Sequence, residues 1–491
     1  MRKGKVVAVV ALSLVLIMTT VISGLAQPWA KEFSTNFTLV NLGTGAAKGV
    51  INYVLTDGSA WGGGSEAFSI ADVGGQAIFR QYADPGDPGN PNLTSDRGSV
   101  VVESDMPLGA VVQIQARGQN PTSNGAYSGF TNTDSTFIVP LVARKKVTAS
   151  GTGSSQVIVQ NTGTVEADIE IEMVNKDGSS RHSDTKNDLQ PGASYYYDLD
   201  LESSSNVPDN WIGSAVVSTA TPNAALAVVS NFFTGDAMQT FNGFGATSPD
   251  TKWFVPLFTS RLGNSLSTPI AVQNYSGGTL AIDDVTVDCN PDPARTDLSP
   301  FTLTNGTAID DTAAFYFNPV VDTSIPEKWQ GSCVVEAADD VVVFVQMRFI
   351  DAGEAAAYEG IPGIPDTSAN TTAYIPLVAK RLGNGFATAV TIQNLTDQTA
   401  TFDLTYIPSS DYGGSSSPVE ITGVTVGPYE SLIQNHRTTD GVSALPEKWF
   451  GSLVVESDYT VGAFVQLTFV RSINPGIPGG DTFMAHNAFT Q

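Results

Sequence analysis

Positively charged side chains, histidine and cysteine are all scarce in this chain of 491 residues. Lys and Arg together number 24 against 49 Asp and Glu, which gives a formal net charge of −25 at pH 7. Nucleic acids and anionic membrane surfaces are bound through clustered cationic side chains, so this balance argues against both kinds of partner. An acidic surface keeps an exported protein soluble and attracts cations.

The three histidines, His182, His436 and His486, fall at positions that do not correspond to one another in the pattern described below. A nucleophile needs a base beside it, and a transition-metal site needs clustered His or Cys ligands. The sequence therefore predicts no catalytic residue, no transition-metal site and no cofactor, and it favours a protein that is not an enzyme.

Paired carboxylates occur at Asp283-Asp284 and Asp310-Asp311, and two carboxylates are what glycoside hydrolysis requires. Both pairs lie near strand starts or turns, where Asp commonly caps the backbone. The glycine-rich segment 151–155 lacks the full spacing of a phosphate-binding loop. A secreted hydrolase is therefore the least favoured of the functions considered.

Long hydrophobic runs are also missing, with one exception at the N-terminus. Cationic residues precede an apolar run from Val6 to Ile22, and Gly24 and Ala26 provide the small residues of a cleavage site after Ala26. We expect residues 1–26 to be a signal peptide; an uncleaved membrane anchor is the alternative. No second apolar run follows, so we expect the mature chain to be secreted or extracellular and to have no membrane span. Retention of the secreted chain at the cell surface is compatible with this hypothesis.

Internal repetition is what the sequence has in abundance. Three short motifs recur in the same order: Pro-Leu at Pro140, Pro256 and Pro376; a Gln-Asn step ending at Asn161, Asn274 and Asn394; and Trp-x-Gly-Ser beginning at Trp211, Trp329 and Trp449. A degenerate fourth copy opens the mature chain, with Asn41 and Gly98 at matching positions. Matching spacings as well as matching residues indicate repeated structural modules.

Within one copy the hydrophobic period is two, as in "GSLVVESD", and about seven such runs are separated by turn residues. Seven short strands per copy resemble immunoglobulin-like or fibronectin-III-like β-sandwich modules, and their tandem arrangement resembles that of bacterial secreted surface and adhesion proteins. The resemblance implies an all-β fold of four tandem Ig-like β-sandwich modules after the signal peptide. It also implies a structural or adhesive role, with other cell-surface or matrix components, or copies of the chain itself, as partners.

The repeat predicts the following boundaries: module 1 at 27–130, module 2 at 136–246, module 3 at 252–366, module 4 at 372–479, and a C-terminal tail at 480–491. Segments 116–135, 235–250 and 351–371 are rich in Gly, Ser, Asn, Thr or Pro, so we expect them to be linkers open to proteolysis. For the apolar tail, one hypothesis is that it joins module 1 of another molecule in a head-to-tail association. The favoured alternative is that it folds back on module 4 or is disordered.

The two cysteines, Cys289 and Cys333, both lie in the third copy. Export makes oxidation favourable, so we expect them to form one disulfide bond.

The sequence contains candidates for two further kinds of ligand site. Acidic loops around Asp84 and Asp87, and around Asp198 and Asp200, are weak candidates for Ca²⁺, with solvated turns as the alternative. The repeated Trp211, Trp329 and Trp449 are candidate platforms for sugar rings, which would make the chain a carbohydrate-binding protein. A Trp fixed in every full copy more often closes a hydrophobic core.

Overall fold

The computed structural model describes residues 11–12, 33–81, 93, 96–116, 122–131, 133–148, 151–200, 207–363, 370–410, 412, 414 and 417–491. Within these residues every regular element is a β-strand and every pair of strands is antiparallel. The expectation of an all-β fold is confirmed. No helix in the described part of the chain is long and apolar enough to cross a membrane.

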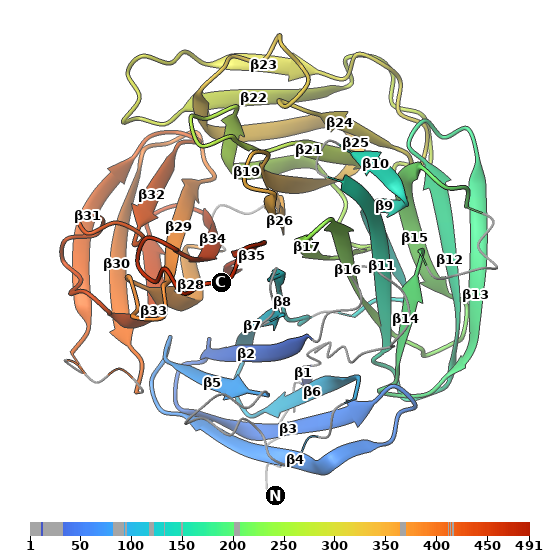
Figure 1. Cartoon of the computed structure of the whole chain (residues 1–491), viewed down its shortest axis with the longest axis horizontal. Coiled ribbons are helices and arrows are strands. Elements are labelled where there is room, and N and C mark those ends of the chain that lie inside the picture. The colour runs from blue at the N-terminus through green and yellow to red at the C-terminus, as the bar shows by residue number, and fades with distance from the viewer. Residues whose placement is uncertain are drawn as a thin grey trace, which may run out of the picture.

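The strands gather into four modules around a central axis, in chain order (Figure 1). Module 1 contains β2 (Ser34–Asn41), β3 (Ala47–Leu55), β4 (Ala60–Ile70), β5 (Gln76–Arg80), β6 (Gly98–Ser104), β7 (Leu108–Gln115) and β8 (Asn124–Ser128). Module 2 contains β9 (Thr136–Arg144), β10 (Lys146–Thr148), β11 (Gly151–Asn161), β12 (Ala167–Asn175), β13 (Arg181–Leu189), β14 (Ser194–Asp198), β15 (Trp211–Thr219), β16 (Leu226–Thr234), β17 (Ala237–Asn242) and β18 (Phe244–Gly245).

The second half of the chain repeats the arrangement. Module 3 contains β19 (Asp250–Ser260), β20 (Leu266–Ser267), β21 (Ile270–Asn274), β22 (Val285–Pro291), β23 (Phe301–Thr304), β24 (Ala314–Phe317), β25 (Trp329–Phe349), β26 (Glu354–Glu359) and β27 (Ile361–Pro362). Module 4 contains β28 (Thr372–Ala379), β29 (Phe386–Asn394), β30 (Ala400–Pro408), β31 (Val419–Val426), β32 (Ser431–Asn435), β33 (Phe450–Ser457), β34 (Val461–Phe469), β35 (Phe483–Asn487) and β36 (Phe489–Thr490).

Each module has an outer and an inner layer of strands, and in modules 1, 2 and 4 these layers are separate sheets. In module 3 the long strand β25 pairs with strands of both layers, so its strands form one sheet of nine. Module 4 shows the layering most simply. Its outer sheet runs β31-β30-β33-β28-β36, and its inner sheet, nearer the axis, runs β32-β29-β34-β35. Side chains on the outer strand β30 alternate between buried and exposed, because one face of that sheet packs on the core and the other meets solvent. The result is a β-sandwich-like layering of two antiparallel sheets.

The strand order differs from that of an immunoglobulin domain. There the first strand lies beside the second, in the order A-B-E-D, and the seventh lies beside the sixth. Here the first strand of module 4, β28, pairs with the sixth, β33, and the seventh, β34, pairs with the second, β29. The resemblance to immunoglobulin-like modules therefore holds for the two-sheet design and not for the order of the strands.

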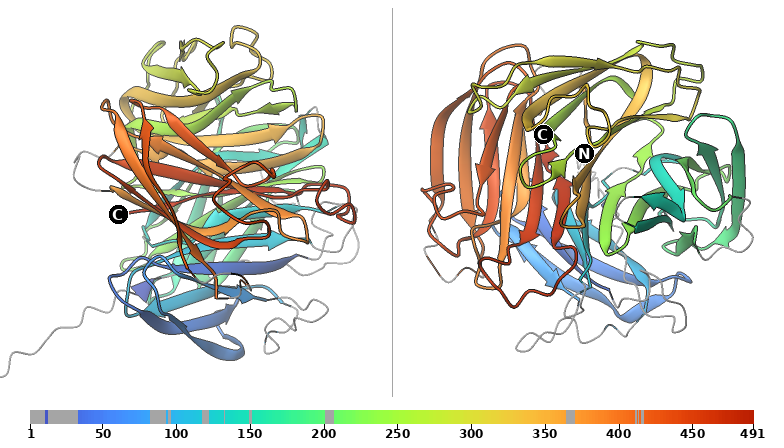
Figure 2. Two further views of the ribbon diagram at one scale, coloured as in Figure 1. Left: turned by 90° about the vertical axis from the view of Figure 1, so that its left-hand side faces the viewer. Right: turned by 45° about the horizontal axis from the view of Figure 1, so that its top comes forward.

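Four strands, one from each module, surround the central axis (Figure 1). These axial strands are β8, β17, β26 and β35, and each lies against the axial strand of the module before it and of the module after it, including β35 against β8. Module 4 therefore meets module 1, and the four modules form a closed ring, which Figure 2 shows from two further directions.

The axial strands lie in or beside the segments that were expected to be flexible linkers. Strands β8, β17 and β26 fall within 116–135, 235–250 and 351–371, and their side chains are almost all buried. The small residues of these strands allow the backbones of neighbouring modules to approach closely. A Cβ atom on Gly125, for example, would lie 2.2 Å from Thr240 Oγ1 of the next module. The linker prediction is wrong for these strands, because small residues also mark tight packing.

The expected C-terminal tail completes module 4. Strand β35 pairs with β34, and β36 pairs with β28. Phe483 and Met484 are 1% and 0% exposed, so one molecule covers the apolar side chains of its own tail.

The predicted signal peptide lies outside the described residues except for strand β1 (Ala11–Leu12). This short strand pairs with β6. It takes the position that β9, β19 and β28 have in the other modules, where they pair with β15, β25 and β33.

Candidate functional site

One hydrogen bond is repeated at all four junctions between modules. The serine of each Gly-Ser step is buried and donates its hydroxyl to a backbone carbonyl of the next module. The bonds are Ser99 to Gly192 (2.8 Å), Ser214 to Thr312 (2.5 Å), Ser332 to Tyr429 (2.8 Å) and Ser452 to Gly74 (2.6 Å). The last bond joins module 4 to module 1, so the closing junction uses the same chemistry as the other three.

The accepting carbonyls belong to residues with a left-handed backbone. Gly74, Gly192, Thr312 and Tyr429 have φ values of 71°, 76°, 64° and 58°. Each precedes the edge strand of an inner sheet, and the turn presents its carbonyl oxygen to the neighbouring module. A non-glycine residue at positive φ is uncommon, yet Thr312 and Tyr429 adopt this conformation at two of the four positions.

The glutamine of the Gln-Asn step holds three of these carbonyls from within their own module. Gln160, Gln273 and Gln393 donate Nε2 to the same carbonyls, those of Gly192, Thr312 and Tyr429. Module 1 has Val40 at this position, so the Gly74 carbonyl receives only the Ser452 hydroxyl among the hydrogen bonds of the described residues.

The asparagine of the same step is a structural residue inside each module. The side chain of Asn394, for example, donates Nδ2 to the carbonyls of Gln398 and Gly427 and accepts the backbone N–H of Thr396. Asn41, Asn161 and Asn274 make equivalent bonds, and all four side chains are fully buried. The repeated motif therefore fixes a turn within the module.

At one end of the axis, the axial strands finish in four residues at equivalent repeat positions: Ser128, Asn242, Glu359 and Asn487. Ser128 donates to the Asn487 carbonyl (3.0 Å), Asn487 to the Glu359 carbonyl (2.8 Å), and Asn242 to the Ser128 carbonyl (2.8 Å). Glu359 instead accepts the backbone N–H of Asn242 at 2.6 Å. These bonds form a polar belt that runs through all four modules.

A cavity of about 320 Å³ opens beside this belt, and we call it the axial pocket. All four modules contribute to its lining, which contains the four residues of the belt together with Phe130, Phe137, Phe244, Trp253 and Phe489. Burial raises the pKa of the Glu359 carboxyl to about 7. A carboxyl group that titrates near neutrality inside a cavity is a feature typical of ligand and catalytic sites.

Asp481 occupies the opposite end of the axial strands. Its backbone carbonyl accepts Asn124 Nδ2 of module 1 at 2.6 Å, and its carboxylate accepts the N–H of Met238 in module 2 at 2.9 Å. Burial raises the pKa of this carboxyl well above its usual range, while backbone N–H groups of Met238, Phe483 and Ala355 oppose the rise. One residue near the chain end thus connects all four modules.

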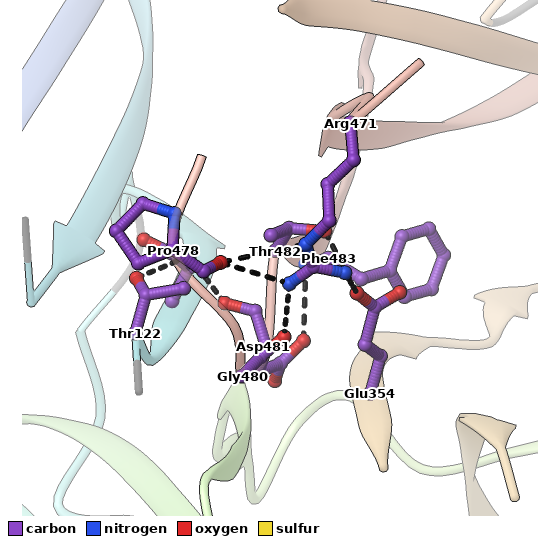
Figure 3. Close-up of polar contacts among 9 residues, drawn as sticks. Thr122, Glu354, Arg471, Pro478, Gly480, Asp481, Thr482 and Phe483 are labelled. Carbon is purple, nitrogen blue, oxygen red and sulfur yellow. Dashed lines mark hydrogen bonds and ion pairs between the residues drawn. The ribbon is translucent and has the colours of Figure 1, made fainter. Parts of the chain in front are cut away.

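Figure 3 shows how the neighbouring contacts extend this connection to the surface. The backbones of Thr122 and Asp481 are hydrogen-bonded, and Arg471 donates to the Gly480 carbonyl and forms an ion pair with Glu354 at 2.9 Å. Thr482 donates its hydroxyl to the same Glu354 oxygen. These bonds join module 4 to modules 1 and 3.

The candidate sugar platforms are core residues. Trp211, Trp329 and Trp449 are 5%, 1% and 1% exposed, and the rings of Trp329 and Trp449 contact Phe301 and Tyr406 edge-on. A sugar cannot stack on a ring face that the protein itself covers, so the platform hypothesis is wrong for the folded ring.

The candidate Ca²⁺ loops receive no support. Asp84 and Asp87 lie outside the described residues. Asp198 accepts the backbone N–H of Asp200, and Asp200 lies 4.0 Å from the ammonium group of Lys145. Among the residues that the structure describes, no group of three His, Cys, Asp or Glu side chains could hold a metal ion.

The predicted disulfide bond between Cys289 and Cys333 is confirmed. The two residues face each other directly on the paired strands β22 and β25, with their Cα atoms 4.1 Å apart. Both are buried, at 2% and 1% exposure, so the bond lies in the core of module 3.

The sequence did not point to Glu359, Asp481 or the axial pocket. The repeat carried one usable signal: the runs "AYSGF", "TFNGF", "AYEGI" and "AHNAF" place one polar residue at the same position in every copy. A polar residue kept between apolar neighbours indicates a buried polar contact, and only the ring geometry shows that the four meet.

No protein-family model matches the chain, and no curated protein matches it. Among solved structures, 12 chains match. One of them, the crystal structure of Thermotoga maritima 1070, has 20% sequence identity over 25% of this chain and 96% of that chain, with a TM-score of 0.20.

Proposed function

We propose that this protein is a secreted, non-enzymatic structural or adhesive component of the cell surface, built of four repeated β-sandwich modules closed into one ring. The observation that carries the proposal is the serine–carbonyl hydrogen bond repeated at every junction, including Ser452 to Gly74 between the last module and the first. In this proposal the repeat builds a single rigid body.

Several features support a role in which shape and surface matter. The repeated Trp fills the core, the repeated Ser joins neighbouring modules and the repeated Asn fixes a turn. The repeated residues therefore stabilise the structure of the ring. The outer sheets and their loops face solvent in all four modules, which gives the ring four similar faces for contact with other surface or matrix components (Figure 1). The acidic charge of the chain keeps such a body soluble after export.

The test is the location and the binding behaviour of the mature protein. Antibody labelling of producing cells should place it on the envelope, and the purified ring should bind intact cells or extracted matrix. A screen with common hydrolase substrates should give no turnover above that of the heat-unfolded protein. Retention inside the cell, or hydrolysis that purifies with the ring, would contradict the proposal.

A further inference from the structure

The axial pocket contains a carboxylate that no described cation neutralises. Glu359 is 9% exposed, and no Lys or Arg among the described residues forms an ion pair with it. The equivalent residues of the other modules are Ser128, Asn242 and Asn487, so an acidic group at this place is not required to close the ring. The other ionisable residue in the pocket lining is Asp134, which is also acidic.

Two carboxamide oxygens beside Glu359 are also left without a donor. The Nδ2 groups of Asn242 and Asn487 donate to the carbonyls of Ser128 and Glu359, which fixes the orientation of both amides. The Oδ1 atoms are then acceptors, and both are buried and have no hydrogen-bond partner in the structure. A buried acceptor without a donor costs about 1–3 kcal/mol, and these two oxygens add negative partial charge beside Glu359 that no donor of the described residues offsets.

Apolar surface surrounds this group of acceptors. Phe130, Phe244, Trp253 and Phe489 come from four different modules and line the same cavity. A volume of about 320 Å³ admits several non-hydrogen atoms, which is more than a single metal ion needs. Aromatic walls with acceptor oxygens are the usual surroundings of an organic cation.

We infer that the axial pocket binds a small organic ammonium ion, whose N–H groups donate to the Glu359 carboxylate while the aromatic walls cover its carbon chain. The carboxylate supplies the charge-assisted hydrogen bond. The aromatic side chains that cover the ligand come from all four modules. The inference goes beyond the structural role proposed above and does not depend on where the protein is located.

The experiment is calorimetric titration of the mature protein with n-butylammonium, with 1-butanol as a neutral probe of the same size. The ammonium should bind at least tenfold more tightly than the alcohol. Its affinity should rise between pH 6 and pH 8, because the Glu359 carboxyl, with a pKa of about 7, must lose its proton. Equal affinities for the two probes would overturn the inference.

Two variants and one control locate the site. Glu359→Gln should weaken n-butylammonium at least tenfold, and Ser248→Trp, which places a large ring in the pocket lining, should abolish binding while the unfolding temperature stays close to that of the wild type. Glu420→Gln, an exposed acidic residue of module 4, should change nothing. If Glu359→Gln folds and binds n-butylammonium as tightly as the wild type, or if Ser248→Trp retains binding, the ammonium is not held in this pocket.

Discussion

At the scale of single residues, the Trp-x-Gly-Ser motif divides its work between the core and the junction. The Trp ring fills the interior of its own module, and the Ser hydroxyl reaches the next one. The residue directly after the Ser, such as Ala215 or Leu453, is again fully buried in the core. The motif performs both tasks in modules 2, 3 and 4, whereas module 1 has Asp96 at the Trp position and keeps only the Gly-Ser step at Gly98 and Ser99.

The four junction serines are predicted to differ in their contribution to stability. In Ser214→Ala, the Thr312 carbonyl keeps the Gln273 donor, so the lost hydrogen bond should cost about 1 kcal/mol. In Ser452→Ala, the Gly74 carbonyl loses the only donor that the described residues provide, so the cost should approach about 2–3 kcal/mol. Chemical denaturation of both variants measures the difference. Equal losses would show that the Gln donors do not matter, and no loss at Ser452 would show that the closing junction does not form.

The buried carboxyl of Glu359 is predicted to make stability depend on pH. Its pKa rises from 4.5 to about 7 on folding, so its protonated form stabilises the folded state fully below pH 4.5, and this contribution is lost as the pH rises through 7. The difference in unfolding free energy between the wild type and Glu359→Gln should therefore fall by about 3 kcal/mol from pH 4.5 to pH 8.

The difference in unfolding free energy between the wild type and Glu359→Gln is the correct quantity to measure. Other buried groups make stability depend on pH in the opposite direction, and their effect is common to both proteins. Burial lowers the pKa of His436 to about 3 and of His486 to about 4, so their contribution to stability is lost as the pH falls below 6.5. A difference that stays constant across the pH range would mean that the Glu359 carboxyl is not desolvated in the folded ring.

At the scale of strands and turns, the sequence predicted what a local pattern can specify. Period-two alternation predicted strands such as β33, and the third copy predicted a disulfide between the strands that carry Cys289 and Cys333. The runs "AYSGF", "TFNGF" and "AYEGI" predict closing strands in the first three copies, but they lie in segments rich in small residues, which also predicted linkers there. The burial of strand β8 depends on β17, β26 and β35, which are distant in the sequence. The local sequence pattern therefore could not predict that β8 is buried.

Tight packing at the axis gives a prediction for Gly125. A Cβ at this position would lie 2.2 Å from Thr240 Oγ1, so Gly125→Ala should destabilise the ring by about 1–3 kcal/mol through overpacking. Gly263→Ala is the matched control, because nothing lies within 4 Å of its Cβ position. Thermal unfolding of the two variants provides the comparison, and a Gly125→Ala protein as stable as the control would place β8 away from β17.

The disulfide bond should contribute to the stability of module 3. It spans a sequence separation of 44 residues, for which the chain-entropy account gives about 4 kcal/mol. The double variant Cys289→Ala/Cys333→Ala should unfold at a correspondingly lower denaturant concentration than the wild type. A loss below about 1 kcal/mol would mean that the sheet pairing of β22 and β25 already supplies this constraint.

At the scale of the whole molecule, tandem repeats in a sequence leave the arrangement of the modules open. The same four modules could stand in a row, and the apolar tail could then join a second molecule. The structure instead places β35 against β8, and Asp481 forms hydrogen bonds with residues of modules 1 and 2. The sequence repeat predicts similar modules, but closure depends on the angle between neighbours, which the sequence does not show.

Closure of the ring is tested most directly by the radius of gyration of the mature protein in dilute solution, measured by small-angle X-ray scattering. A compact body of this length should give about 23 Å, whereas four modules in a row should give roughly 40 Å. The ring predicts the smaller value, together with a pair-distance distribution that has one maximum. A radius near the larger value, with a long tail in that distribution, would contradict the closed ring.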